Sequence, residues 1–486
     1  MERLRNTEAA EVFRFFEEIC RIPHGSGNIG QISDYLAKFA RDRQLEYVQD
    51  GVKNVIIIKE ATPGYEDEAP ILLQGHMDMV AVKKPDCLKD MKKEGLDLRA
   101  DGDWLYAEGT SLGGDDGIAV AYMLAVLDSD SIAHPRMEAV ITVEEETGMD
   151  GARAIDLSIC KGKRMLNLDS EEEGIFLTSC AGGARIHGFL PAVRTKAKGL
   201  RYRISIEGLQ GGHSGGEIHK ERGNSNCLAG RLLYMACREA GARLEFAEGG
   251  LADNAIPRQT GIGLVVEPAD AERLDAVLAK FESEVKRELS TKDPGFAVRL
   301  AERAEGEFAA LTREDSRRAA FLLLTIPNGV QSMSADIPGL VQTSLNLGIM
   351  RLLEDGLHLD YSVRSSVGSE KELLMEKVIA LLASQGGKWE VSGEYPAWEY
   401  RKNSPLREKM VEVYQRMFQK APRVEAIHAG LECGILSSKI EGLDCVSIGP
   451  NMKDIHTTEE KLSISSTERI WKYVLAVLAE KDRDHN

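Results

Sequence analysis

Four segments in the N-terminal part of the chain combine short apolar runs or glycines with histidine and acidic residues. They are residues 71–78 (ILLQGHMD), 109–117 (GTSLGGDDG), 141–149 (ITVEEETGM) and 166–174 (LNLDSEEEG). Three of them are typical of a buried strand that runs into polar side chains, and ligands of open α/β sheets bind outside the carboxyl ends of the strands. Adjacent carboxylates repel each other unless a cation lies among them. The pattern therefore predicts an α/β domain with a metal site, and it offers enough donors for two ions.

Taken singly, two of these segments also allow a simpler interpretation. A histidine two residues before a carboxylate, as in His76 and Asp78, is how proteins fix a metal-ligating imidazole, but it also suits a solvated strand end. Asp115 and Asp116 stand at the start of an apolar helix, where acids can simply cap the helix and complement its dipole. The case for a metal site thus depends on the four segments together.

The pattern of strands and helices changes along the chain. Apolar strands alternate with helices up to about residue 187, which indicates an α/β domain. From there to about residue 396, strands mixed with long helices indicate an α+β domain. A new helix is expected at Ser404-Pro405, and the last helix is expected to begin with a capping box at residues 465–468. A chain of 486 residues is too long for one core, which agrees with two domains.

Composition excludes some classes of protein. The formal net charge is −17 with no basic stripe, so nucleic acid is not an expected partner. The apolar runs are too short to span a bilayer, and we expect no membrane partner. The eight cysteines are scattered and never approach CxxC spacing. This distribution is typical of free thiols in a reducing compartment. We expect a cytoplasmic protein.

Together with residues 179–183, 211–219, 428–434 and 454–460 (DIHTTEE), the four segments resemble the zinc-dependent exopeptidases that include aminoacylases, carboxypeptidases and dipeptidases. The most similar branch is that of the dipeptidases acting on aminoacyl-histidine. The resemblance covers residue 5 to about 480. It implies a cofactor of two Zn²⁺ per chain, with Co²⁺ or Mn²⁺ as possible substitutes, and a dipeptide as substrate.

The resemblance also implies a role for each matching residue. One zinc is held by His76 and Asp169 and the other by Glu146 and His456, while Asp115 bridges both, Asp78 orients His76 and Glu145 is the general base. Relatives carry an aspartate where this chain has Glu144, the first of its three glutamates. Because these glutamates follow a strand, we expect neighbouring side chains to point to opposite faces, so Glu145 and Glu146 have different roles.

An inserted lid domain is the second implication. The catalytic domain is expected to be discontinuous, residues 1–187 and 397–486, because His456 must meet ligands from the first part of the chain. The lid, residues 188–396, is expected to bring His213 as the donor to the oxyanion. Arg364 is the candidate for a bidentate contact with the substrate carboxylate, with Asn254 as a polar companion. A homodimer through the lid is a further expectation, with His213 acting either in cis or from a partner subunit.

Two rival functions stay open. A relative that cleaves N-acyl amino acids, or a carboxypeptidase, uses the same metals, and substrate length and chemistry distinguish it from a dipeptidase. A non-catalytic binding protein on the same scaffold is expected to lack a ligand or the base, and every position is present here.

Overall fold

The computed structural model describes residues 2–482, which divide into two compact units. Unit 1 comprises residues 1–179, 400–426 and 431–486, and unit 2 comprises residues 180–399 and 427–430. We expected the divisions at 187/188 and 396/397, and residue 187 lies inside strand β9 (Gly182–Pro191). The first and the last residues that the structure describes, Glu2 and Asp482, both belong to unit 1.

Unit 1 is built on an eight-stranded mixed sheet with the order β1-β2-β6-β3-β7-β21-β8-β20. Its central strands β6, β3, β7 and β21 run parallel, so their carboxyl ends lie at one edge. Strand β21 comes from the C-terminal part of the chain and pairs with β7, which joins the two parts of this unit in one sheet. The strands of unit 1 are β1 (Glu46–Gln49), β2 (Val55–Lys59), β3 (Ile71–His76), β4 (Leu98–Asp101), β5 (Trp104–Ala107), β6 (Met137–Thr142), β7 (Arg164–Asn167), β8 (Ile175–Cys180), β20 (Arg423–Ile427), β21 (Asp444–Ser447), β22 (Met452–Lys453) and β23 (Lys461–Ser463).

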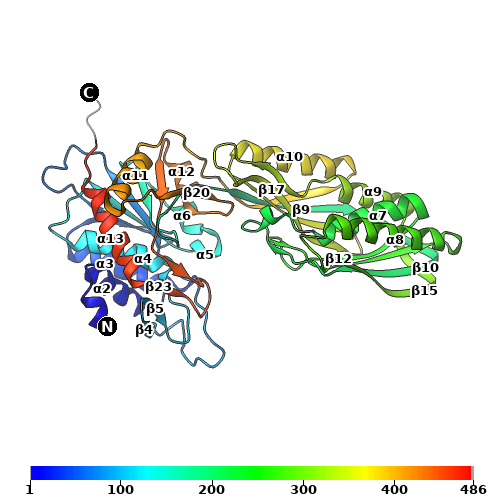
Figure 1. The fold of residues 1–486 in the computed structure, drawn as a ribbon, viewed down its shortest axis with the longest axis horizontal. Coiled ribbons are helices and arrows are strands. Elements are labelled where there is room, and N and C mark those ends of the chain that lie inside the picture. Colours follow the sequence, from blue (N-terminus) through cyan, green and yellow to red (C-terminus); the bar gives the residue numbers. More distant parts are fainter. Residues whose placement is uncertain (1, 483–486) are drawn as a thin grey trace. The chain divides into compact units, whose positions relative to one another are not determined.

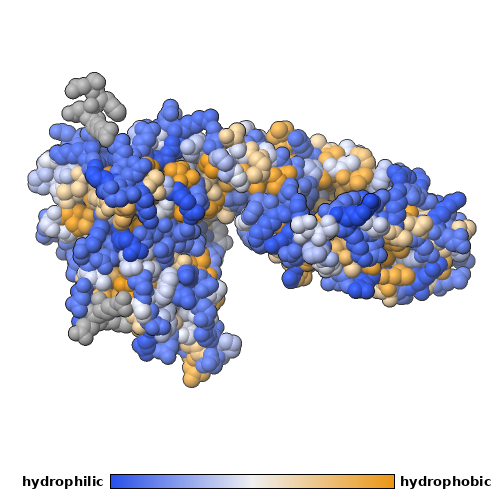
Figure 2. Space-filling model, viewed as in Figure 1, coloured by the Kyte–Doolittle hydropathy of each residue, from blue (hydrophilic) through white to orange (hydrophobic). Residues whose placement is uncertain are grey.

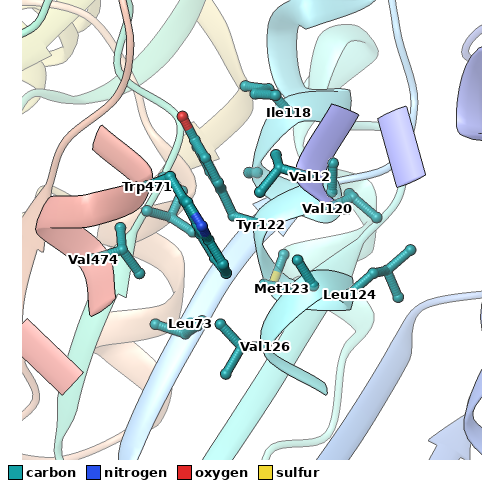
Figure 3. Close-up of a cluster of buried hydrophobic side chains, with 14 of the residues drawn as sticks. Val12, Leu73, Ile118, Val120, Tyr122, Met123, Leu124, Val126, Trp471 and Val474 are labelled. Atoms are coloured by element: carbon teal, nitrogen blue, oxygen red, sulfur yellow. The ribbon is translucent and has the colours of Figure 1, made fainter. Parts of the chain in front are cut away.

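Helices cover this sheet, and one of them is buried along its whole length. All residues of helix α4 from Gly114 to Leu127 are buried, as expected of a helix that is apolar on every face. On α4, Tyr122 stacks on Trp471 of the last helix with the ring centroids 6.0 Å apart (Figure 3). The helices of unit 1 are α1 (Glu2–Arg5), α2 (Ala10–Cys20), α3 (Gly30–Asp42), α4 (Gly114–Asp128), α5 (Glu145–Gly148), α6 (Asp150–Ala154), α11 (Pro405–Phe418), α12 (Glu432–Lys439) and α13 (Ile464–Ala479).

The two predicted helix starts in the C-terminal part had different outcomes. Helix α11 begins at Pro405, and the hydroxyl of Ser404 accepts a hydrogen bond from the Arg407 amide, as predicted. The predicted capping box at residues 465–468 is wrong, because Ser463 caps α13 by accepting from the Ser466 amide. The β23 strand leads directly into this cap, so the helix starts before the Ser-Ser-Thr-Glu sequence.

Unit 2 is an antiparallel sheet with helices α7 to α10 against one face (Figure 1). The strand order is β15-β10-β14-β12-β17-β18-β9-β19, with β16 pairing to β17. This is the α+β arrangement predicted for this part of the chain. The elements of unit 2 are β9 (Gly182–Pro191), β10 (Arg194–Glu207), β11 (Gly212–His213), a 3-10 turn (Ile218–Lys220), α7 (Ser225–Ala240), β12 (Arg243–Gly249), β13 (Ala255–Ile256), β14 (Thr260–Val266), a 3-10 turn (Pro268–Asp270), α8 (Ala271–Glu288), β15 (Ala297–Leu311), α9 (Arg313–Thr325), β16 (Gly329–Met333), β17 (Val341–Leu352), β18 (Gly356–Ser365), α10 (Gly368–Ser384) and β19 (Lys388–Tyr395).

The surface of both units is mainly hydrophilic on the face drawn in Figure 2, with scattered hydrophobic side chains. Among residues 2–482, no helix has the length and apolarity needed to cross a bilayer. All eight cysteines lie within these residues and are free thiols.

Candidate metal centre and substrate-binding residues

The parallel strands of unit 1 bring the predicted ligands together at one edge of the sheet. Strand β3 ends at His76, β6 is followed by Glu146, and β7 is followed by Asp169. Because β3 pairs in parallel with both β6 and β7, these three positions lie at the same end of neighbouring strands. Their side chains meet Asp115 from the start of α4 and His456 from the C-terminal part of the chain.

His76 is oriented by hydrogen bonding at one of its two ring nitrogens. Its Nδ1 lies 2.9 Å from the main-chain carbonyl oxygen of Asp78 and 3.5 Å from the Asp78 carboxylate. A carbonyl oxygen only accepts, so Nδ1 carries a proton, which leaves Nε2 as the nitrogen that would bind a metal ion. That Nε2 points toward Asp115 and Asp169, with oxygen atoms at 3.2 and 3.6 Å.

Asp115 lies between the two histidines. Its Oδ1 is 3.2 Å from Nε2 of His76, and its Oδ2 is 3.1 Å from Nε2 of His456. Nε2 of His456 is also 3.0 Å from Oε2 of Glu146. Each oxygen of one carboxylate thus faces a different imidazole, which is the arrangement that a carboxylate shared by two metal ions requires.

The donor set fits two transition-metal ions. Donor atoms of His76, Asp115 and Glu146 lie within 4.8 Å of one another, and so do those of His76, Asp116 and Asp169. Imidazole nitrogens combined with carboxylate oxygens are a ligand set that suits zinc. Without metal, the donors favour protonated forms of their neighbours. Hydrogen bonds to Asp115 and Glu146 raise the pKa of His456 to about 10, and burial raises the pKa of Asp169 to about 6. Metal binding releases such protons.

Glu460 holds the loop that carries Asp115. Its buried carboxylate accepts hydrogen bonds from four consecutive backbone amides, those of Leu112, Gly113, Gly114 and Asp115, at 2.7, 3.0, 2.9 and 3.3 Å. These amides precede or begin α4, so a carboxylate there also complements the helix dipole. Sequence reasoning gave Glu460 no role, although it lies in the same motif as His456.

Asp116 is not a helix cap, so the simpler interpretation of this residue is wrong. Its side chain caps no amide of α4, is fully buried and accepts from the backbone amide of His76 at 3.2 Å. The peptide bond between Asp115 and Asp116 is cis. Burial and the nearby charge of Asp169 raise the pKa of Asp116 well above its usual range. Asp116 therefore holds the end of β3 at His76, one of the predicted metal ligands.

The three consecutive glutamates are not extended, contrary to prediction. Glu144 adopts a left-handed conformation with φ 55°, and residues Glu145–Gly148 then form the short helix α5. The Glu144 carboxylate turns away to accept from the amide of Gly27 at 2.8 Å. The Asp78 carboxylate accepts from the amide of Glu145 at 3.1 Å, so Asp78 holds this turn as well as His76. Burial raises the pKa of Glu145 well above its usual range.

A second cluster, in unit 2, contains the predicted lid residues. His213 lies in the two-stranded pair β11–β13, opposite Ala255 and next to Asn254. Its Nδ1 accepts from the amides of Gly215 and Gly216 at 3.2 and 3.0 Å. An accepting Nδ1 places the proton of the neutral ring on Nε2, so His213 presents a hydrogen-bond donor. Burial and Arg364 lower the pKa of His213, which favours this neutral form.

Arg364 is held beside His213 with part of its guanidinium unused. Its Nη1 donates to the hydroxyl of Tyr395 at 3.1 Å, while its buried Nε has no partner among the described residues. A Cβ on Gly215 would come within 3.2 Å of this Nε and 3.0 Å of the His213 ring, so the close approach requires glycine. His428 completes the cluster through Ser344, with Nε2 2.7 Å from the hydroxyl.

The chain is similar to known peptidases over its full length. Residues 72–480 match the sequence profile of peptidase family M20/M25/M40. The chain is 35% identical over 482 residues to the cytosol non-specific dipeptidase of Escherichia coli, which covers 99% of both chains. It belongs to peptidase family M20/M25/M40. A crystal structure of the aminoacylhistidine dipeptidase from Vibrio alginolyticus superposes with a TM-score of 0.93 at 32% identity, covering 99% of each chain. The aminopeptidase PepT from Bacillus cereus, 15% identical, shares the fold with a TM-score of 0.58 over 97% of this chain and 98% of its own.

Membership of family M20/M25/M40 confirms the predicted resemblance and the predicted fold class.

Sequence reasoning missed residues whose hydrogen-bond partners lie far away along the chain. Besides Glu460, these include Glu432, whose carboxylate accepts from Thr142 and Gln74 at 2.5 and 2.6 Å, and Tyr395 beside Arg364. The glutamate within the glycine-containing segment 428–434 was the signal in the sequence that could have indicated Glu432.

Proposed function

We propose that this member of family M20/M25/M40 is a metal-dependent dipeptidase whose hydrolytic centre is the metal-ligand cluster of unit 1. The observation that carries the proposal is Asp115, whose two carboxylate oxygens face two different imidazoles. The full-length relatives from Escherichia coli and Vibrio alginolyticus are both dipeptidases by name, which supports the dipeptide as substrate.

Two Zn²⁺ are the proposed cofactors, with Co²⁺ or Mn²⁺ able to substitute. His76 and Asp169 would hold one ion and Glu146 and His456 the other, with Asp115 shared. When bound, the ions supply Lewis acidity that polarises the scissile carbonyl and lowers the pKa of a water molecule.

Glu145 is the proposed general base. The carboxyl is half-buried, and its raised pKa suits a group that takes a proton from water and later returns it to the leaving amine. Asp78 accepts from the Glu145 amide, which holds the turn that places Glu145 beside the ligand Glu146.

The residues that bind the rest of the substrate are proposed to come from unit 2. Nε2 of His213 is the donor for the oxyanion of the tetrahedral intermediate, because its Nδ1 is already occupied as an acceptor. The unpartnered Nε of Arg364 suits the substrate carboxylate, since a guanidinium can bind it in bidentate fashion. The exposed side chain of Asn254, next to His213, is a polar companion. We propose the cytoplasm as the compartment, following the name of the Escherichia coli relative.

Metal analysis of the purified protein, together with activity measurements on a panel of substrates, tests this proposal. Purified protein is expected to carry two zinc ions per chain, to lose activity with a chelator and to regain it with Zn²⁺. The panel contains dipeptides, the matching tripeptides, N-acyl amino acids and longer peptides with free carboxyl termini. Cleavage confined to dipeptides supports the proposal. Preferred cleavage of N-acyl amino acids or of long peptides would replace it with one of the two rival hydrolases, and absence of bound metal would refute it.

A further inference from the structure

Arg364, Gly183 and Tyr395 lie beside one another on three neighbouring strands of unit 2. Strand β9 lies between β18 and β19, and its Gly183 pairs with Arg364 on one side and with Tyr395 on the other. Side chains of directly paired residues point to the same face of a sheet. Two strand spacings separate the arginine from the tyrosine, about 10 Å, which only long side chains can span. They meet above the glycine because it has no side chain to block them.

Two glycines and a buried lysine fix the position of Tyr395. A Cβ on Gly183 would lie 2.6 Å from the Tyr395 hydroxyl oxygen, and a Cβ on Gly430 would lie 2.8 Å from Cε2 of the same ring. Both distances are too short for a real Cβ, so the ring occupies the space that two other side chains would take. The buried ammonium of Lys371 donates to the Tyr395 carbonyl oxygen at 3.1 Å and holds the backbone.

The Tyr395 hydroxyl engages one side of the Arg364 guanidinium. Nη1 of Arg364 donates to this hydroxyl at 3.1 Å. Nε is buried, and within residues 2–482 neither Nε nor Nη2 has a hydrogen-bond partner. In a guanidinium, Nε–H and one N–H of Nη2 lie parallel on one edge and form a fork that fits a carboxylate. Tyr395 therefore binds the nitrogen that this fork does not use.

Holding the arginine in advance strengthens its binding of an anion. A long side chain loses rotamer freedom when it is fixed in a complex, so a guanidinium that is already fixed binds more tightly than a mobile one. A phenylalanine at position 395 would fill the same space between the two glycines, but it could not accept from Nη1. The hydroxyl is thus the part of Tyr395 that acts on Arg364.

We propose that Tyr395 is a positioning residue that keeps the Nε and Nη2 edge of Arg364 directed at the substrate carboxylate. This inference rests on the proposed function and deepens it, because it names the group through which unit 2 recognises the free carboxyl terminus of a dipeptide. Tyr395 acts through Arg364 and does not itself contact the substrate.

The first test compares Tyr395→Phe with Tyr400→Phe. Tyr400 is the matched control because Arg407 lies over its ring, 5.0 Å from the centroid, and does not depend on its hydroxyl. Each variant receives the best dipeptide of the panel and the C-terminal amide of that dipeptide, which lacks the carboxylate. Tyr395→Phe is expected to raise KM for the dipeptide about 2- to 10-fold with kcat unchanged, the usual value of one hydrogen bond. The amide is expected to react equally with wild type and both variants.

A double-mutant cycle shows whether the effect passes through Arg364. In the Arg364→Met background the fork is absent, so Tyr395→Phe is expected to cause no further change in KM. Additive losses in the double variant, equal losses on the dipeptide and its amide, a reduced kcat with unchanged KM, or no change in Tyr395→Phe would overturn the inference.

Calorimetry separates this inference from the proposed function. Binding is measured in the Glu145→Gln background, in which turnover is expected to be low. Tyr395→Phe is expected to weaken binding of alanyl-alanine by the same factor and to leave binding of alanyl-alaninamide unchanged. If this pattern is found but the wild-type protein cleaves no dipeptide, the proposed function is refuted and the role of Tyr395 is not. If the wild-type protein cleaves dipeptides but the acid and the amide bind alike, the role of Tyr395 is refuted and the proposed function is not.

Discussion

Replacing Glu460 by glutamine should destabilise unit 1 and weaken metal binding at the same time. The Glu460 carboxylate accepts from four consecutive amides, two through each oxygen. Glutamine keeps one acceptor oxygen and places an NH₂ group where the other oxygen was. Two buried N–H groups then lose their acceptor and face a donor.

The size of the effect follows from these two lost contacts. A buried polar group without a partner costs about 1–3 kcal/mol, so two amides predict a loss of about 2–6 kcal/mol in the free energy of unfolding. The same amides fix the loop that carries Asp115. Because groups that orient metal ligands usually contribute about 10- to 100-fold to metal affinity, zinc should bind more weakly by a similar factor.

Glu459 is the matched control. Its side chain is 64% exposed and pairs with Lys84 at the surface, where an ion pair contributes no more than about 1 kcal/mol. Urea unfolding followed by circular dichroism, and zinc competition with a chelator, are measured for Glu460→Gln, Glu459→Gln and wild type. If Glu460→Gln unfolds within about 1 kcal/mol of the control and keeps its zinc affinity, the four-amide contact does not hold the loop as argued.

Three further changes test the centre, the lid residues and the effect of pH. Asp115→Ala should lose zinc at both sites and all activity, and two zinc ions per chain after the change would contradict the shared role, as measured by metal analysis. Glu145→Gln should keep both zincs and lower turnover by about 10²–10⁴, whereas Glu146→Gln should lose one zinc and recover partly with excess metal; exchanged phenotypes would reverse the assignment. His213→Ala should keep its zinc and lose about 10²–10³ in kcat, the usual loss for one oxyanion donor, and an unchanged kcat would remove it from the mechanism. Burial and Arg364 lower the pKa of His428 to about 3, so between pH 6.5 and 3 the unfolded chain binds a proton that the folded chain does not. Stability should therefore decrease as the pH is lowered through this window, by up to about 5 kcal/mol, and the stability of His428→Gln should decrease less steeply in acid unfolding. Parallel pH curves for the two proteins would show that the histidine does not contribute.

The sequence alone predicted the candidate site residues and several of the segments that become strands. The apolar runs at residues 71–73, 139–143 and 165–168 predicted the central strands because a run of apolar residues is a local property that a short window records. The resemblance of the ordered motifs added His456, which lies far from the other ligands along the chain. These predictions needed no knowledge of packing.

Tertiary structure decided how those residues are held. Glu460 meets Leu112 across 348 positions of sequence, and no local pattern indicates such a pair. Glu144 leaves the extended conformation because its carboxylate binds the Gly27 amide, which turns Glu145 and Glu146 into a short helix. Asp116 is drawn beneath the end of β3 by the His76 amide instead of capping its own helix. Each of these choices follows from a buried polar group finding a partner in another part of the chain, which is a property of the folded molecule and not of any segment by itself.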